Sequence, residues 1–354
     1  MSLPDLSSVE QFLRTHYELS GRVELLPGER DHNLRVFSNR GDFVFKIMHP
    51  GCDPSLVDLQ IQALAHLHRE MPRAQVPKVL KTPAGNSTVT FDDPVAGHRL
   101  GWLISLLPGD LMANQRPWRS STAASVGCTL GQLNQALASF KHPCLDRHYE
   151  WDLRQSQWLR ERSKALSNTP DRELVERVAD HFDQTLSAQL DDLERAAIHG
   201  DGNDMNILLD PSPDGDCRVC GVIDFGDMVA TPRVCEPAIA AAYVMMGEDE
   251  EEEVRVERCV ALIQAYHQAY PLAADELALL PALVRLRWAV SVTNAAHNAQ
   301  VNPDNVYLGV SGGDALALLR QFAHTIDALL RPTIEGLTTP LNDSTRQHAD
   351  SGGL

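Results

Sequence analysis

The sequence has no apolar run long enough to cross a membrane. Its longest, from Ala238 to Met246, is far shorter than the roughly 20 residues that a membrane-spanning helix needs. The start, from Met1 to Asp5, lacks the basic and apolar segments of a signal peptide. These two absences predict a cytoplasmic protein with no membrane partner.

An excess of positive charge and a regular cysteine pattern are also missing. The net charge of −17 disfavours a nucleic-acid partner, because an acidic surface repels a phosphate backbone. Seven cysteines without regular spacing indicate reduced thiols. Cys217 and Cys220 form a CxxC, but they lie in an expected strand, where residues three apart point to opposite faces. We therefore interpret this pair as structural.

Two motifs contain the candidate catalytic and metal-binding residues. His199-Gly200-Asp201 is followed by four residues and Asn206, and Asp224-Phe225-Gly226 comes later in the chain. Apolar, β-rich runs end near 209 and at 223, and an Asp-Gly turn signal at 214–215 separates them. A strand-turn-strand arrangement would bring Asp201, Asn206 and Asp224 together. Phosphoryl transfer needs such a point: a carboxylate facing the acceptor hydroxyl, and an Asn and an Asp holding Mg²⁺.

The paired motifs resemble those of the aminoglycoside phosphotransferase and choline kinase superfamily, which has His-Gly-Asp where protein kinases have His-Arg-Asp. The resemblance implies an α+β, protein-kinase-like fold of two lobes. Residues 1–107 would form a nucleotide-binding lobe with an antiparallel sheet and a helix. Residues 108–337 would form a mainly helical catalytic and substrate lobe. The polar end, 338–354, is expected to be disordered.

Hydrophobic periodicity gives the expected elements. Strands are expected at 23–26, 34–37, 43–48, 76–80, 87–91 and 102–107. Helices are expected at 8–20, opening on Ser8 as a cap, and at 55–70, 121–138, 172–190, 254–270 and 276–298. Two helices have a clear buried stripe: Val126, Leu130, Leu133 and Leu137 in one, and Leu174, Val178, Phe182 and Leu186 in the other.

The nucleotide site follows from the resemblance. Lys46, inside an expected strand, matches the lysine that neutralises the phosphates. Asp58, in the next helix, is the candidate to pair with Lys46, the alternative being a solvated carboxylate at a helix start. Arg30 and Asn33 lie in the turn that corresponds to the phosphate-covering loop. Ser105 and Leu107 precede the Pro108-Gly109 break, where backbone groups of this fold meet the purine of ATP or GTP.

Three stretches resemble the hydroxylysine kinase branch and so narrow the range of possible acceptors: 221–228, 235–246 and 296–308. An amino-acid alcohol carries an ammonium and a carboxylate besides its hydroxyl. Asp227 and Glu236 are the candidates for the ammonium and Arg233 for the carboxylate; alternatively, all three are surface charges. Choline would call for an aromatic cage, whereas only 6% of residues are aromatic and no aromatic cluster flanks the motifs.

The sequence therefore predicts a small-molecule kinase that uses Mg²⁺ and ATP or GTP. Asp201 would orient and deprotonate the acceptor hydroxyl, and His199 would serve as a scaffold. The expected acceptor is a hydroxylated amino acid, with 5-hydroxylysine preferred. Homoserine, choline or ethanolamine, and aminoglycosides stay open as acceptors, as does a non-catalytic binding module of the same fold. The sequence does not determine the oligomeric state.

Overall fold

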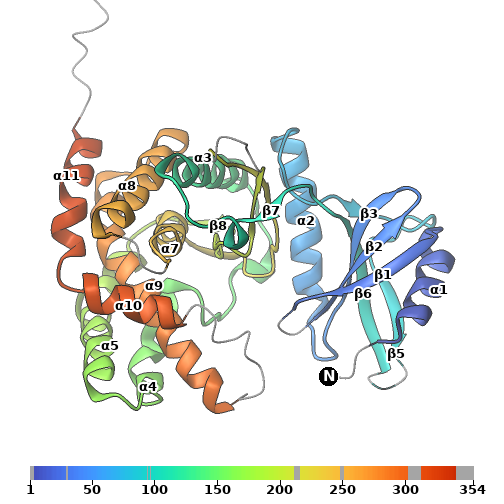
Figure 1. The fold of residues 1–354 in the computed structure, drawn as a ribbon, viewed down its shortest axis with the longest axis horizontal. Coiled ribbons are helices and arrows are strands. Elements are labelled where there is room, and N and C mark those ends of the chain that lie inside the picture. The colour runs from blue at the N-terminus through green and yellow to red at the C-terminus, as the bar shows by residue number, and fades with distance from the viewer. Residues whose placement is uncertain are drawn as a thin grey trace, which may run out of the picture.

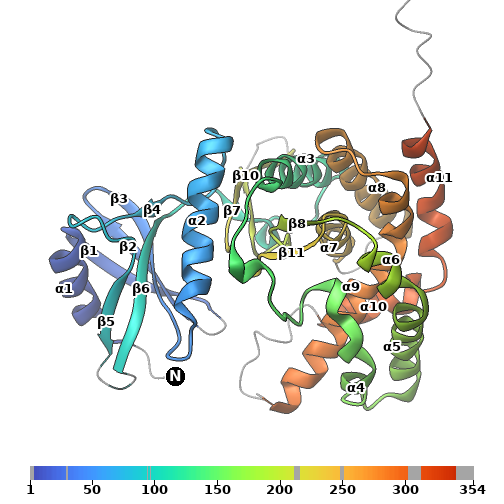
Figure 2. The same ribbon diagram turned by 180° about the vertical axis from the view of Figure 1, so that it is seen from behind.

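The protein is described from a computed structural model that covers residues 4–28, 31–93, 95, 97–210, 216–247, 251–301 and 312–339. Figure 1 shows two lobes, a sheet-containing N-terminal lobe and a mainly helical C-terminal lobe, with helix α2 (Pro54–Glu70) standing between them. The view from behind gives the same arrangement (Figure 2). The expected α+β architecture is confirmed.

An antiparallel sheet forms the N-terminal lobe, in the order β1-β2-β3-β6-β4 with β5 paired to β6. Alternation of apolar residues produces it, because one face must be buried. Leu34 pairs with Phe45 and Val36 with Phe43 across β2 and β3, and all four side chains are buried. The elements are α1 (Leu6–Tyr17), β1 (Gly21–Leu26), β2 (His32–Ser38), β3 (Gly41–Ile47), β4 (Val79–Leu80), β5 (Val89–Asp93) and β6 (Gly97–Ser105).

Several of the expected boundaries in this lobe are wrong, and two of them are informative. Helix α1 is capped by Asp5, whose Oδ2 accepts from Ser8 N at 2.9 Å, so Ser8 lies within the helix. The strand expected at 76–80 is reduced to Val79–Leu80. An aspartate carboxylate is as good a helix cap as a serine hydroxyl, and the structure uses the earlier of the two residues.

The C-terminal lobe holds two small sheets among its helices. One sheet has the order β10-β9-β7 and the other pairs β11 with β8. The strands are β7 (Asp110–Leu111), β8 (Arg195–Ile198), β9 (Ile207–Asp210), β10 (Arg218–Val222) and β11 (Val229–Pro232). The main helices are α3 (Ser120–Leu137), α4 (Leu159–Ser163), α5 (Thr169–His181), α6 (Ser187–Asp191), α7 (Cys235–Val244), α8 (Glu252–Ala269), α9 (Ala274–Val301), α10 (Gly312–Phe322) and α11 (Ile326–Thr338).

Both expected helical stripes are buried, but the expected helix at 172–190 is not regular. It ends as α5 at His181, passes through one π-turn at Phe182–Leu186 and resumes as α6. The turn keeps Phe182 and Leu186 in the core. No helix in the described ranges is long and apolar enough to cross a membrane.

The chain leaves the first sheet at Ser105 and enters the second at Asp110. A small apolar core lies between α1 and the N-terminal sheet. A much larger core fills the C-terminal lobe and includes Val57 and Leu64 of α2 together with Trp102 of β6, so α2 packs against both lobes. The hairpin turn expected at 214–215, the stretch 302–308 and the tail from 340 onward lie outside the described residues.

Candidate active site

Asp201 lies in the loop between β8 and β9, where donors from three side chains converge on it. Asn203 Nδ2 lies 2.9 Å from both carboxylate oxygens. Asn206 Nδ2 donates to Oδ2 at 2.7 Å, and Arg287 Nη2 donates to Oδ1 at 3.2 Å. Gly200 permits this sharp loop: its φ is +81°, and a Cβ there would lie 2.8 Å from Asp227 O. The side chain of Asp201 is thus held in one orientation, with 18% of it exposed.

Sequence reasoning missed Asn203 and Arg287. Asn203 stands inside the four-residue gap of the motif, so only its position beside Asp201 could have suggested a role. Arg287 comes from α9, and its guanidinium also donates to Tyr243 Oη at 3.2 Å. It is 1% exposed and balances the negative charge of the loop. No local sequence signal links α9 to the loop.

The pKa of Asp201 is raised to about 8: burial is the largest cause, the carboxylates of Asp227 and Asp224 act in the same direction, and Arg287 opposes the shift. A carboxylate with a raised pKa is a better proton acceptor for a hydroxyl group, since its basicity is closer to neutral pH. Bound cations would counteract this shift, because positive charge favours the ionised carboxylate. The loop therefore places a basic carboxylate where an acceptor hydroxyl can approach.

His199 is a scaffold residue, as expected. Its ring is fully buried, with Nε2 3.0 Å from Ile223 O and Nδ1 accepting from Asp201 N at 3.3 Å. The ring packs edge-on against Phe225 at 4.8 Å. One imidazole thus connects the two motifs, and both of its nitrogen atoms are occupied by backbone groups.

Asp224 and Lys46 meet across the two lobes. Lys46 Nζ on β3 lies 3.7 Å from Asp224 Oδ1, and this ion pair lowers the pKa of Asp224. Asp224 has a φ of +61°, an uncommon conformation for a residue other than glycine, and such backbone outliers cluster at functional sites. The lysine is 9% exposed, whereas half of the Asp224 side chain is exposed.

Asn206 and Asp224 provide the oxygen atoms that Mg²⁺ prefers. Asn206 donates through Nδ2 to Asp201, which leaves its Oδ1 oxygen able to coordinate a cation. Within the described residues, no group of three or more His, Cys, Asp and Glu side chains could hold a metal ion by itself. A two-ligand site fits Mg²⁺, which commonly completes its shell with waters and substrate phosphates.

The expected pairing of Asp58 with Lys46 is wrong. Asp58 Oδ2 accepts from Gln62 Nε2 at 2.6 Å and lies 3.2 Å from His142 Nε2. The side chain of Asp58 is 55% exposed and faces His142 of the C-terminal lobe, while Val57 and Leu64 face the core. Burial of the apolar stripe fixes the rotation of α2 and so directs Asp58 away from the lysine.

The other residues predicted for the nucleotide site are Asn33, Ser105, Leu107 and Arg30. Asn33, near the start of β2, is the cross-strand partner of Lys46 on β3, so the two residues lie side by side. Ser105 N donates to Lys78 O at 2.8 Å and Ser105 Oγ accepts from Lys78 N at 2.9 Å. Leu107 lies close to Gly221 of β10. Arg30 lies outside the described residues.

Asp227 stands beside the catalytic loop. Burial raises its pKa, and a hydrogen bond from Tyr149 opposes that shift. It contributes to the raised pKa of Asp201 and is half-buried. Of the three residues expected to contact the acceptor's charged groups, Asp227 is the one that the structure places next to Asp201.

The other two are structural, which corrects the expectation. Arg233 forms a bidentate ion pair with Glu276, with Nε–Oε1 and Nη2–Oε2 distances of 2.9 and 2.8 Å. Glu236 is fully buried. Its Oε2 accepts from the backbone N–H groups of His199 at 2.7 Å and Gly200 at 3.2 Å. Arg233 and Oε2 of Glu236 are thus held by partners distant in sequence inside the fold.

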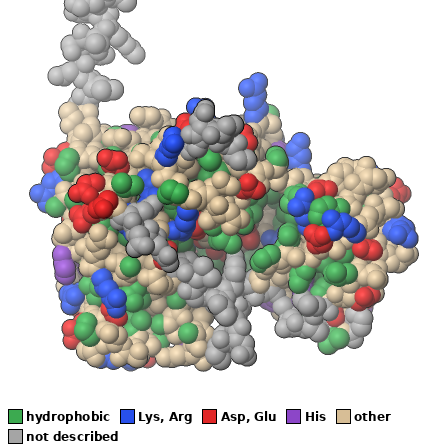
Figure 3. Space-filling view, viewed as in Figure 1, with side chains coloured by type: hydrophobic (Ala, Val, Ile, Leu, Met, Phe, Trp, Pro, Cys, Tyr) green, Lys and Arg blue, Asp and Glu red, His purple; other side chains and the backbone are tan. Residues whose placement is uncertain are grey.

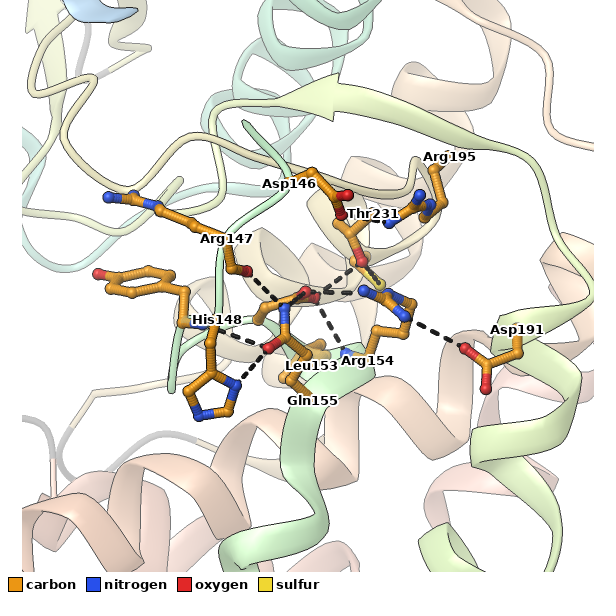
Figure 4. Close-up of polar contacts among 12 residues, drawn as sticks. Asp146, Arg147, His148, Leu153, Arg154, Gln155, Asp191, Arg195 and Thr231 are labelled. Carbon is orange, nitrogen blue, oxygen red and sulfur yellow. Dashed lines mark hydrogen bonds and ion pairs between the residues drawn. The ribbon is translucent and has the colours of Figure 1, made fainter. Parts of the chain in front are cut away.

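A polar network places the segment 146–155 against this region. Asp152 is buried and accepts from Thr231 Oγ1 and Gln155 Nε2, both at 2.8 Å; Thr231 and Gln155 converge in Figure 4. Gln155 Nε2 also donates to Arg147 O at 2.9 Å. Arg147 Nη2 in turn donates to Gly226 O at 2.6 Å. The network joins this segment to β11 and to the loop after Phe225.

Aromatic rings gather beside Asp201, contrary to the expectation from sequence. Trp151 and Tyr243 lie over the Arg287 guanidinium, with ring centroids 4.7 and 5.3 Å from its Cζ. Tyr149 lies against Arg147 at 4.5 Å. The rings come from segments far from the motifs, and arginines already occupy their faces. They do not form an open cage for a quaternary ammonium.

The fold and the site define a kinase-like phosphotransferase: a lysine on an N-lobe strand faces an aspartate next to the catalytic loop, and that loop presents a held carboxylate. The phosphotransferase enzyme family, APH, matches residues 22–285. The chain therefore belongs to this family and is a small-molecule kinase that acts on a hydroxyl acceptor.

Similar proteins were found both by sequence and among solved structures. Hydroxylysine kinase of Mus musculus is 28% identical over 307 residues, covering 80% of this chain and 79% of that protein. Homoserine kinase of Zymomonas mobilis is 26% identical over 281 residues, with 76% and 79% covered. Among solved structures, a microcompartment-associated aminopropanol kinase has a TM-score of 0.68 at 19% identity, covering 91% of this chain and 99% of that one. An amicoumacin kinase complex has a TM-score of 0.67 at 15% identity, with 91% and 95% covered. The structures support the protein-kinase-like fold.

Proposed function

We propose that this chain transfers the γ-phosphoryl group of ATP or GTP to the hydroxyl of a hydroxylated amino acid, with 5-hydroxylysine as the expected acceptor. The observation that carries the proposal is the convergence of Asn203, Asn206 and Arg287 on Asp201, beside the Lys46–Asp224 pair. The relatives support the acceptor class, because those named hydroxylysine kinase and homoserine kinase act on amino acids that carry a side-chain hydroxyl.

The chemistry assigns one task to each group. The hydroxyl oxygen of the acceptor attacks the γ-phosphorus, the bond from that phosphorus to the β-γ bridging oxygen breaks, and the nucleoside diphosphate leaves. Asp201 orients the hydroxyl and receives its proton. Lys46 neutralises phosphate charge from β3. Asn206 and Asp224 would hold Mg²⁺, which supplies positive charge at the phosphate oxygens.

Asp227 is the proposed partner of the acceptor's ammonium. It lies next to Asp201 and is half-buried, so a cation bound there would be close to the reacting hydroxyl. Its carboxylate has a raised pKa, and a bound ammonium would lower it by favouring the charged form. On the nucleotide side, Ser105 and Leu107 are the proposed backbone contacts for the purine, and Asn33 is the proposed contact for the phosphates.

The test is a panel of acceptors crossed with both nucleotides. Nucleoside diphosphate release is measured for 5-hydroxylysine, homoserine, choline and kanamycin with ATP and with GTP, and acceptor-free reactions give the background. The highest kcat/KM is expected for 5-hydroxylysine. A higher value for homoserine, choline or kanamycin would overturn the acceptor assignment. Nucleotide binding without acceptor-dependent release for any hydroxylated compound would instead favour a non-catalytic module.

A further inference from the structure

Helix α9 carries a row of buried polar side chains that begins at the catalytic loop. We call Arg287, Ser291 and Asn294 the α9 polar stripe; they are 1%, 2% and 1% exposed. Their spacing of four and three residues places them on one face of the helix. The stripe starts at Arg287, whose Nη2 contacts Asp201, and continues for two turns toward the C-terminal end of α9.

Each residue of the stripe has a polar atom without a hydrogen-bond partner among the described residues. These atoms are Nε and Nη1 of Arg287, Oγ of Ser291 and Nδ2 of Asn294. An unsatisfied buried donor is destabilising, so native proteins rarely leave several together. Thr293, on another face of the helix, is satisfied by Ala289 O at 2.7 Å. Within the described part of α9, the unpaired buried atoms thus all lie on the face that starts at Asp201, although buried atoms without a partner occur elsewhere, as at Glu236 Oε1 and Arg147 Nε.

The unpaired atoms are nearly all hydrogen-bond donors. Both free nitrogens of Arg287 can only donate. Asn294 Oδ1 accepts from Arg162 Nη1 at 2.8 Å, and this contact fixes the amide so that its NH₂ group is the unpaired end. The Ser291 hydroxyl can donate as well. Donors on a positively charged side chain complement a group that only accepts and is negatively charged, namely a carboxylate.

We propose that the α9 polar stripe binds the carboxylate of the acceptor, with Arg287 and Ser291 as its main ligands and Asn294 at the far end. This inference rests on the proposed function, since it concerns an amino-acid acceptor. It replaces Arg233, which is committed to Glu276. The acceptor is then held at three points: its hydroxyl at Asp201, its ammonium at Asp227 and its carboxylate on α9.

Arg287 and Ser291 are four residues apart on α9, about 6 Å along the helix axis, so their side chains are neighbours on one face of the helix. The guanidinium is covered by Trp151, which is half-buried and has its ring centroid 4.7 Å away. Binding therefore requires the Trp151 side chain to shift, a kind of rotamer change that is common when partners bind.

The experiment compares two acceptors that differ only in the carboxylate: 5-hydroxylysine and its decarboxylated form, 1,5-diaminopentan-2-ol. Ratios of kcat/KM for the pair are measured in the wild type and in Arg287→Lys, Ser291→Ala and Asn294→Asp. Thr293→Val is the matched control, because it removes a buried polar group from the same helix outside the stripe. Thermal unfolding and nucleotide binding of each variant show whether the fold is retained.

The wild type is expected to prefer the carboxylate-bearing acceptor strongly. Arg287→Lys should reduce kcat/KM for 5-hydroxylysine by roughly 10–100-fold, the loss typical of one lost charged contact, and should change the diamine much less. Asn294→Asp keeps an acceptor for Arg162 but adds negative charge, so it should raise KM for 5-hydroxylysine and not for the diamine. Thr293→Val should leave the ratio unchanged.

Equal losses for both acceptors in Arg287→Lys, together with an unchanged ratio in Asn294→Asp, would overturn the inference and reduce Arg287 to a positioning residue for Asp201. If Arg287→Lys fails to fold, Ser291→Ala and Asn294→Asp decide, because neither residue contacts Asp201 in the described structure. A wild type that phosphorylates no hydroxylated amino acid contradicts the proposed function itself. An active wild type whose variants keep its selectivity contradicts only the role of the stripe.

Discussion

At the scale of single residues, the carboxylate of Asp201 is the group on which turnover is expected to depend most. Asp201→Asn keeps the size of the side chain but removes the negative charge that accepts the proton. We expect kcat to fall by about 10²–10⁴-fold, the usual contribution of a general base, with a much smaller change in nucleotide affinity. Steady-state kinetics and nucleotide binding check this. Asp210→Asn, exposed at the end of β9, is the control, and a similar loss in both variants would contradict the role of Asp201.

The metal assignment depends on Asp224 and Asn206. Asp224→Ala removes a charged oxygen ligand, and Asn206→Ala removes a neutral one together with a hydrogen bond to Asp201. Both variants should need more Mg²⁺ for half-maximal rate, and Asp224→Ala should need the most because charge contributes more to a hard cation. The measurement is initial rate against free Mg²⁺ at saturating nucleotide. Superimposable titrations of wild type and Asp224→Ala would exclude Asp224 as a ligand.

At the scale of elements, the catalytic loop is attached to α7 through Glu236. One carboxylate oxygen accepts from two consecutive backbone N–H groups, and burial raises the pKa of this side chain. Glu236→Ala leaves both donors unsatisfied, which costs about 1–3 kcal/mol for each buried group. Glu236→Gln retains an oxygen in the same place. We expect a clear loss of stability and kcat in the alanine variant and a small loss in the glutamine variant.

Urea unfolding and kcat of the two Glu236 variants provide the check. The comparison separates a positioning role from acceptor binding. If Glu236 contacted the ammonium of the acceptor, Glu236→Gln would raise the acceptor KM while the stability stayed near that of the wild type. Such a result would restore the assignment that the structure has corrected.

At the scale of the whole molecule, the two lobes are connected by a segment with little room at Gly109. Gly109 has a φ of +108°, and a Cβ there would lie 2.3 Å from Cys220 Sγ and 2.9 Å from Leu209 O. Gly109→Ala therefore adds steric conflict with β9 and β10 to backbone strain of about 1–3 kcal/mol. We expect a lower Tm and a higher KM for the nucleotide, because the strain displaces one lobe relative to the other.

Gly85→Ala is the matched control for this substitution. Gly85 also has a positive φ, +89°, but no atom lies within 4 Å of a Cβ built there. It should lose stability through backbone strain alone and keep the nucleotide KM of the wild type. The same KM in Gly109→Ala and Gly85→Ala would show that the contact with β9 and β10 does not control the nucleotide site.

On the face drawn in Figure 3, acidic and basic side chains are interspersed over both lobes.

The sequence by itself determined the elements and the reactive groups. Apolar periodicity placed most helices and strands, because each must bury one face. The Asp201–Asn206 spacing and the Asp224 motif predicted the chemistry, because Asn206 precedes β9 and Asp224 follows β10, two strands that pair with each other. Lys46 was singled out because it stands in a strand upstream of the kinase-like motifs, but the partner predicted for it, Asp58, was wrong, since Asp224 lies beside it in the structure.

Only the tertiary structure determined which partner each charged side chain contacts. Arg233 and Glu236 have the charges that an amino-acid acceptor needs, yet Glu276 and the backbone of the catalytic loop use them. Asp58 was excluded by the rotation of α2, which its buried stripe sets. Arg287 reaches Asp201 from a helix 86 residues further along the chain. Such partners are fixed by the packing of distant elements, and packing leaves no local pattern in the sequence.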